Sequence, residues 1–435
     1  MDFKNIDMQE LSAVQTAHRR DIHKYPENAW TEFRTTSKII DKLEEFCVPY
    51  LYGRDVHTKG ERYGVPDDAY LEMCYKRAVD EGADPARVEK MKGGYTGVIA
   101  VFDTGRPGPT TALRFDIDCI DAIETSDPGH VPNKEGFSSE HQNLFHGCGH
   151  DAHNAIGIGV AYILSKCIDQ LCGKIYLVFQ PGEEGLRGGN SMAECGLFED
   201  VDYIFATHVG GPMKGFIITG ASGFAISEKF DIHYEGIASH AGANPEVGHN
   251  ALLAAANAAI NIMAISRHSK GFTRVNVGTL NAGTGRNVIP NVADMKCEVR
   301  GQTQEACDYM AERLVEIGKA AGAMFGCEFT YKIAGKASGA TCDEELNEIV
   351  KKAAEMTEGV VNIMPAPSGI GGGSEDFTTL MHKVQEHGGK ATFFMTSSGS
   401  KYPNHHDHFD IDESCLNLSS RVFCNMVGLL NGREQ

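Results

Sequence analysis

The sequence has little positive charge for its length. It contains 40 Lys and Arg residues against 59 Asp and Glu residues, which gives a formal net charge of −19 at pH 7. Nucleic acids and anionic membrane surfaces attract proteins through a basic face. We therefore expect no nucleic acid and no membrane as a partner, and an anionic substrate would need a local basic pocket.

Paired cysteines and long apolar segments are also absent. The 13 cysteines lie at irregular spacings without a CxxC pair, and the N-terminal MDFKNIDMQELS is polar and acidic, unlike a signal peptide. The best candidate for a membrane span, 251-ALLAAANAAINIMAI-265, is too short and contains two asparagines. These features predict a cytoplasmic protein with reduced thiols and no disulfides.

Internal repeats, low-complexity tracts and nucleotide-binding fingerprints are missing as well. The glycine-rich stretch 369-GIGGG-373 matches neither the dinucleotide pattern nor the P-loop pattern. What the chain does have is an ordinary apolar share of 42% over 435 residues, enough for a large core and two domains.

Apolar strands that alternate with helices predict an α/β domain with a mostly parallel sheet, because such strands must be covered on both faces. Apolar residues spaced three and four apart predict one long helix over residues 8–47, and residues 50–94 look like a charged, helix-prone excursion. The expected strands are 97-GVIAVFD-103, 111-TALRFDID-118, 174-KIYLVFQ-180, 203-YIFATHV-209 and 391-ATFFMTS-397.

A different pattern occupies the middle of the chain. Between residues 221 and 335 the order of elements is βαββαβ, which is typical of a ferredoxin-like unit. The sequence therefore predicts a catalytic domain in two parts, 1–220 and 336–435, with an inserted α+β domain over 221–335.

Polar side chains recur where the predicted strands end, which is where open α/β sheets form their sites. A single histidine there would more often be structural than a ligand. Several candidates at converging strand ends reverse that expectation. The residues are Asp116 and Asp118, Cys148 and His150 before the next helix, Glu183 and Glu184, His208, and the stretch 404-NHHDHFD-410.

These residue types point to metal-assisted hydrolysis. Cys, His and Glu side chains suit zinc, and His with carboxylate also suits manganese, cobalt or nickel. Of the adjacent Glu183 and Glu184, one can bind metal while the other acts as general base. A cysteine hydrolase stays open as an alternative, with Cys148 as nucleophile and His150 or His153 as base.

In this order, CGHDAH, QPGEEG, the strand-end histidine, GGGSEDF and HHDHFDIDE resemble the metal-dependent amidohydrolases related to aminoacylase, hippurate hydrolase and indole-acetyl amino acid hydrolases. The resemblance covers nearly the whole chain. It implies a zinc-exopeptidase-like catalytic domain with a ferredoxin-like lid, two divalent ions (manganese or zinc) and a small N-acyl amino acid as substrate. It also implies a homodimer, or a heteromer with a related second subunit.

Carried over by position, the family's roles fall on named residues of this chain. The metal ligands would be Cys148, His150, Glu184, His208 and His405, with His406 as the alternative to His405. Glu183 would be the general base, Asp118 would orient a ligand, and His240, Arg286 and Asn287 would bind substrate. Asp116 is not expected to be a ligand. Gly147 and Gly182 replace the family's usual alanines without removing a ligand.

Two further functions remain compatible with these residues. One is a broader N-acyl amino acid deacylase or dipeptidase, because the walls of the substrate pocket cannot be placed from the sequence. The other is a non-catalytic subunit of a hydrolase complex, against which the intact Glu183 argues.

Overall fold

The computed structural model describes residue 3, residues 6–367 and residues 373–433. Most of the glycine-rich stretch 369–373 therefore lies outside the described residues. The described chain forms two compact units. Gly223–Gly339 and residues 373–375 make up the second unit, where the sequence predicted an inserted domain over 221–335, and the other described residues make up the first.

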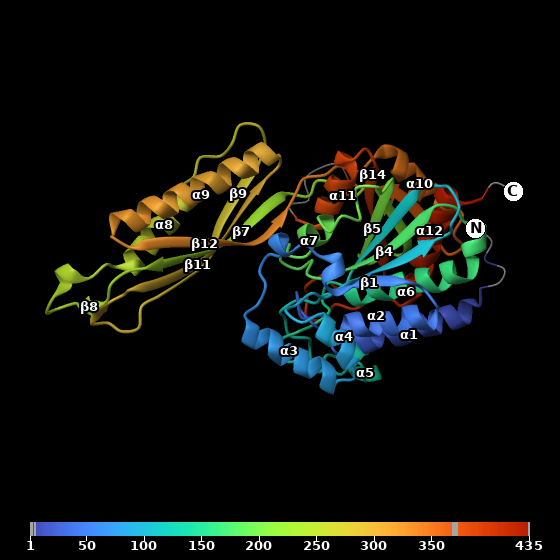
Figure 1. Cartoon of the computed structure of the whole chain (residues 1–435), viewed down its shortest axis with the longest axis horizontal. Helices are drawn as coiled ribbons and strands as arrows, with labels where there is room; N and C mark the ends of the chain where they lie inside the picture. The colour runs from blue at the N-terminus through green and yellow to red at the C-terminus, as the bar shows by residue number, and fades with distance from the viewer. Residues whose placement is uncertain (1–2, 4–5, 368–372, 434–435) are drawn as a thin grey trace. The chain divides into compact units, whose positions relative to one another are not determined.

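The first unit is built on one eight-stranded sheet, in the order β1-β2-β4-β3-β5-β14-β6-β13. Among these strands, Figure 1 labels β1, β4, β5 and β14. The four inner strands, β4, β3, β5 and β14, run parallel, and antiparallel pairing occurs beyond them. The prediction of a mostly parallel sheet is thus confirmed. The strands are β1 (Tyr50–Tyr52), β2 (Val98–Asp103), β3 (Thr110–Asp116), β4 (Lys174–Gln180), β5 (Tyr203–Gly210), β6 (Lys214–Thr219), β13 (Asn362–Pro365) and β14 (Lys390–Ser398).

Helices cover this sheet. The buried helix α6 packs on β3, β4 and β5, and it also contacts α1 and α12. Among the described residues, no helix is both long enough and apolar enough to cross a bilayer. The helices of this unit are α1 (Met8–Lys24), α2 (Phe33–Glu45), α3 (Asp68–Asp80), α4 (Pro85–Lys90), α5 (Val131–Glu135), α6 (His150–Cys167), α7 (Gly189–Ala193), α10 (Glu344–Glu355), α11 (Phe377–Glu386) and α12 (Ser414–Asn431).

The prediction of a single helix over residues 8–47 is wrong, because the helix is interrupted between α1 and α2. Pro26 disfavours helical geometry at the residue before it, and α1 ends at Lys24. In the break, Trp30 has a positive φ of 70°. The carboxylate of Glu27 then accepts hydrogen bonds from the backbone N–H groups of the first turn of α2. The break also carries the buried carboxyl groups of Glu27 and Glu32.

The second unit has the predicted βαββαβ order. Its four-stranded sheet runs β12-β7-β11-β9, with every neighbouring pair antiparallel, which is the strand order of a ferredoxin-like unit. The helices α8 and α9 pack on each other and on this sheet (Figure 1). The elements are β7 (Ile226–Glu235), α8 (Ala251–Met263), β9 (Thr273–Ala282), β11 (Val292–Gly301), α9 (Gln304–Met324) and β12 (Glu328–Ala337), with a short ribbon of β8 (Ser239–His240) and β10 (Val288–Ile289).

Candidate metal centre

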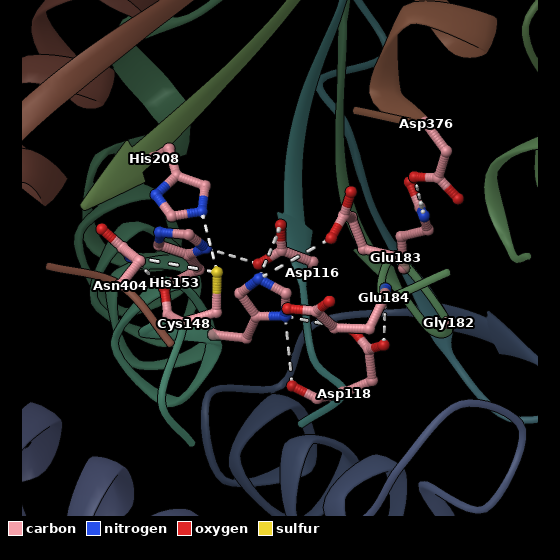
Figure 2. Close-up of polar contacts among 12 residues, drawn as sticks. Asp116, Asp118, Cys148, His153, Gly182, Glu183, Glu184, His208, Asp376 and Asn404 are labelled. Carbon is pink, nitrogen blue, oxygen red and sulfur yellow. Dashed lines mark hydrogen bonds and ion pairs between the residues drawn. The ribbon is translucent and has the colours of Figure 1, made fainter. Parts of the chain in front are cut away.

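Five side chains expected to bind metal converge at the carboxyl ends of the inner strands. Among them, Figure 2 labels Cys148, Glu184 and His208. The sulfur of Cys148 lies 3.5 Å from His208 Nε2 and 3.3 Å from His405 Nε2. His405 Nε2 is also 3.2 Å from a carboxylate oxygen of Glu184. Cys148 therefore belongs to two overlapping groups that could each hold an ion, one with His150 and His208 and one with Glu184 and His405.

Two glycines shape the turn that carries Cys148 and His150. Gly149 has a φ of +87°, and a Cβ atom there would lie 2.5 Å from Cγ2 of Val209. A Cβ atom on Gly147 would lie 2.7 Å from Cδ1 of Ile120. Because neither position has room for a side chain, the turn can pack tightly and direct both ligands to the same side before α6 begins.

Asp118, which the resemblance implies would orient a ligand, contacts two of the candidate ligands. One of its carboxylate oxygens lies 3.1 Å from Nδ1 of His150, and the other accepts the backbone N–H of Glu184 at 2.9 Å. This contact favours the proton on Nδ1 of His150. The lone pair of Nε2 is then available to bind a metal ion. Within the described part of the chain, that buried Nε2 has no hydrogen-bond partner. Burial would lower the pKa of His150, but the charges of Asp116 and Cys148 and the hydrogen bonds to Asp118 and Cys148 together outweigh burial and raise the pKa well above its usual value.

The loop after β4 carries the adjacent pair Glu183 and Glu184. Glu183 is buried, and its carboxylate lies 4.0 Å from His150 Nε2. The start of the loop is anchored by Glu32, whose carboxyl group accepts the backbone N–H of Gly182 at 2.8 Å and the hydroxyl of Thr96 at 2.6 Å. Burial, together with the nearby charge of Asp118, raises the pKa of Glu32 well above its usual value. The hydrogen bond that Glu32 accepts from Gly182 holds in place the backbone directly before Glu183 and Glu184.

His208 is held in the form that a metal ligand needs. Its Nδ1 lies 2.7 Å from the carbonyl oxygen of Val209, so it donates there and Nε2 stays free to face Cys148. Burial lowers the pKa of His208 to about 3, which keeps the ring neutral. Next to it, His153 accepts the backbone N–H of Val209 at Nε2, at 2.8 Å, and its Nδ1 contacts Asp116. Both nitrogens of His153 are therefore engaged.

This geometry does not favour a cysteine hydrolase. Burial raises the pKa of the Cys148 thiol to about 12, whereas nucleophilic cysteines have lowered pKa values. His153, one of the two bases considered for it, has no free nitrogen. A divalent cation would convert the same thiol into a thiolate ligand.

The two histidines left open by the sequence have different surroundings. His405 has a φ of +70°, and its backbone N–H donates to the carbonyl oxygen of Gly147 at 2.7 Å. This conformation turns its ring toward Cys148. The ring of His406 instead stacks on Tyr402, with centroids 4.6 Å apart. The geometry therefore favours His405 over His406 at this centre.

A buried ion-pair network lies behind the ligands, and its central residue, Arg114, was not singled out from the sequence. Arg114 pairs with Asp116 at 2.6 Å and with Asp376 at 3.1 Å. Asp376 also accepts hydrogen bonds from Gln180 and from the backbone N–H of Gly189, both at 2.7 Å. Asp376, in the SEDF motif, thus braces the loop beside the centre (Figure 2). The charged residue inside the apolar strand 111–118 was the available signal.

The expected substrate-binding residues lie together in the second unit. His240 is on β8, which pairs with β10 directly after Asn287. The Nδ1 atom of His240 accepts two backbone N–H bonds, from Gly242 and Ala243 at 3.1 Å each, so its Nε2 carries the proton. Arg286 and Asn287 are exposed. Within its own unit, this ribbon offers three exposed hydrogen-bonding side chains.

Several curated proteins match the chain over nearly their full lengths, among them two hydrolases. It is 40% identical to an indole-3-acetyl-aspartic acid hydrolase from Enterobacter agglomerans over 423 residues, which cover 96% of both proteins. It is 38% identical to one of the subunits of p-aminobenzoyl-glutamate hydrolase from Escherichia coli K12, again over 423 residues and 96% of both. The segments 53-GRDVHTKGERYGVPDD-68 and 283-GTGRNVIP-290 predicted a likeness to this same hydrolase chain, which these matches confirm.

Solved structures agree. An aminobenzoyl-glutamate utilization protein from Klebsiella pneumoniae superposes with a TM-score of 0.83 and 35% identity, covering 97% of this chain and 96% of that one. A Bacillus subtilis protein described as a dinuclear metal-binding peptidase shares the fold, with a TM-score of 0.65 at 24% identity over 97% and 99% of the two chains. The model of peptidase family M20/M25/M40 matches residues 112–428. The chain therefore belongs to this family of hydrolases.

Proposed function

We propose that this chain is a metal-dependent amidohydrolase that cleaves p-aminobenzoyl-glutamate into p-aminobenzoate and glutamate. The observation that supports this proposal most is the 38% sequence identity, over 96% of both proteins, to a subunit of p-aminobenzoyl-glutamate hydrolase. The candidate metal ligands beside Glu183 support it as well. A non-catalytic subunit would have no need of the buried carboxylate of Glu183.

Two divalent ions, manganese or zinc, fit the residues at the centre. A thiol, imidazoles and a carboxylate suit such ions, and the buried Nε2 of His150, which has no hydrogen-bond partner among the described residues, is a donor atom that water does not reach. Cys148 would be shared between the two sites, with His150, Glu184, His208 and His405 completing them. When bound, the ions lower the pKa of water and polarise the amide carbonyl.

The protein side chains transfer the protons and bind the substrate. Glu183 takes a proton from the attacking water as the new C–O bond forms at the amide carbonyl. It returns that proton to the glutamate amine as the C–N bond breaks. His240, protonated at Nε2, donates to the developing oxyanion. Arg286 and Asn287 bind a carboxylate of the glutamate portion. A local positive charge is needed for this role because the chain as a whole is acidic.

A second candidate substrate follows from the 40% identity to indole-3-acetyl-aspartic acid hydrolase. Both named substrates join an aromatic acyl group to an acidic amino acid through an amide. A broader N-acyl amino acid deacylase would use the same chemistry.

For assembly we propose a homodimer, or a heteromer with a related second subunit, because one relative is itself named as a single subunit of its hydrolase. We place the protein in the cytoplasm.

The test is hydrolysis by the purified chain, stripped of metal and then given manganese or zinc. The substrates are p-aminobenzoyl-glutamate, indole-3-acetyl-aspartate, hippurate and acetylated amino acids. Metal-dependent preference for the first supports the proposal, and preference for another substrate moves the assignment to that compound. Metal binding without any turnover would argue for a missing partner or a binding role. Activity that survives a chelator would restore the cysteine mechanism.

The matched variants are Glu183→Gln and Glu194→Gln, the latter removing a half-exposed carboxylate that pairs with Lys383. We expect Glu183→Gln to lower kcat by about 100- to 10,000-fold while metal still binds, because the proton transfers lose their carrier. Glu194→Gln should keep the wild-type kcat. Unchanged turnover by Glu183→Gln would show that another group is the base.

A further inference from the structure

The amide side chain of Asn404 contacts segments that carry candidate ligands (Figure 2). Its Nδ2 lies 3.0 Å from the carbonyl oxygen of Cys148 and 3.4 Å from that of Val209. Val209 directly follows His208, and Asn404 directly precedes His405. The Asn404 side chain therefore links the backbone segments that carry Cys148, His208 and His405.

The orientation of this amide follows from its partners. Carbonyl oxygens accept hydrogen bonds only, so the NH₂ group of Asn404 must face Cys148 and Val209. The amide oxygen then points toward Gly210, where a Cβ atom would lie 2.8 Å from it. The absence of a side chain at Gly210 is thus what leaves room for the amide in this position.

The same NH₂ group also reaches the sulfur. Asn404 Nδ2 lies 3.9 Å from Sγ of Cys148, within the range of an N–H···S hydrogen bond. A metal-bound sulfur carries negative charge and accepts such a bond better than a thiol does. Donation of an N–H to that sulfur withdraws electron density from it, and the bonds around a ligand tune the metal that it holds.

We propose that Asn404 is a positioning residue of the metal centre. Its amide ties the Cys148 turn to the end of β5 and donates a hydrogen bond to the Cys148 thiolate. The inference rests on the proposed metal-dependent function. Asn404 is assigned no contact with substrate. Its proposed role differs from simple loop anchoring because its hydrogen bond changes the electron density on the sulfur.

The experiment uses the full chain loaded with Co²⁺, which gives a sulfur-to-cobalt charge-transfer absorption when a thiolate is a ligand. The test variant is Asn404→Leu, which keeps the side-chain size and removes the donor. The control is Asn417→Leu, another half-buried asparagine, whose amide bonds to Ser12 on α1 and touches no candidate ligand. Absorption spectra and Co²⁺ affinity by calorimetry are measured for each protein.

For Asn404→Leu we expect the charge-transfer band at lower energy, because the sulfur electrons are no longer stabilised by an N–H donor. We also expect Co²⁺ affinity to fall about 10- to 100-fold, the range for residues that orient metal ligands. The control should keep both wild-type values. A folded Asn404→Leu protein with the wild-type band and affinity overturns the inference, and lost affinity with an unshifted band overturns the bond to sulfur.

A second variant covers the case in which Asn404→Leu does not fold. Gly210→Ala retains the amide but forces it away from its place, so the band and the affinity should shift in the same directions. Wild-type values for a folded Gly210→Ala protein would overturn the inference. If the wild-type chain itself shows no sulfur-to-cobalt band, the failure lies in the proposed role of Cys148 as ligand, and the role of Asn404 falls with it.

Discussion

Raising the pH from 6.5 to 9 should weaken the first unit through one buried histidine on α1. Nδ1 of His23 lies 2.8 Å from Asp151, and Nε2 lies 3.0 Å from Glu124. Burial alone would lower the pKa of His23. The hydrogen bonds and charges of the two carboxylates outweigh burial and raise its pKa to about 9. The ring is therefore an imidazolium in the folded protein at neutral pH.

The sign and size follow from linkage. A pKa that is raised on folding contributes stability that is fully present below the unfolded value of about 6.5 and is lost as pH rises through the folded value. Between an unfolded pKa of about 6.5 and a folded pKa of about 9, this contribution is roughly 3 kcal/mol at pH 6.5 and about 0.4 kcal/mol at pH 9. Most of the loss falls within this pH interval.

The assay is urea unfolding of the metal-free chain, followed by the fluorescence of Trp30. It is the one tryptophan of the sequence and is buried in the first unit, so it reports on that unit. The difference in unfolding free energy between wild type and His23→Gln should shrink by roughly 2–3 kcal/mol from pH 6.5 to pH 9.

The matched control is His18→Gln on the same helix. Burial lowers the pKa of His18 to about 4, so its ring stays neutral throughout this pH range. The unfolded ring is half protonated at pH 6.5, so the difference between wild type and His18→Gln should change by only about 0.4 kcal/mol up to pH 9, and in the opposite direction. A difference for His23→Gln that does not shrink would refute the assignment of a buried imidazolium between Asp151 and Glu124.

Two further predictions concern the metal centre and its turn. His405→Gln should weaken binding of at least one Mn²⁺ or Zn²⁺ ion by about 10-fold or more in calorimetry, as expected for a lost ligand, whereas His406→Gln should keep wild-type affinity; the reverse result would make His406 the ligand. Gly149→Ala and Gly196→Ala both place alanine at a φ of +87°, but only the first adds a clash, with Val209 at 2.5 Å. In urea unfolding, Gly196→Ala should lose about 1 kcal/mol from strain alone, and Gly149→Ala clearly more; equal losses would show that the turn can relax.

Much of the fold could be predicted because its signals are local. The strands appear as apolar runs bounded by turns, and the ferredoxin-like order is visible as alternating patterns of period two and 3.6. The prediction of one long first helix is wrong for a local reason too, because Pro26 interrupts the helix although the apolar spacing continues on both sides of it. Candidate ligands could be found because Cys, His and Glu are conspicuous at the ends of apolar strands. Their role as ligands stays a prediction.

The supporting roles of Glu32, Arg114 and Asn404 could not be predicted, because their contacts join distant parts of the chain. Glu32 reaches Gly182, and Arg114 reaches Asp376. Each partner lies more than a hundred residues away along the sequence. Nothing in the neighbourhood of Asn404 marks it as a contact of Cys148, since asparagine beside histidines also reads as an ordinary exposed turn.

These supports explain how ligands on loops can be held for chemistry. Cys148, Glu184 and His405 lie outside helices and strands, where the backbone has no ladder to restrain it. Restraint comes instead from buried polar groups that each satisfy a backbone N–H or carbonyl, as Glu32 does at Gly182 and Asp118 does at Glu184. Burying such carboxylates is costly unless they are paired, so their presence is better explained by the geometry that they impose than by stability. A variant that removes one of them should therefore affect metal affinity even where the fold survives.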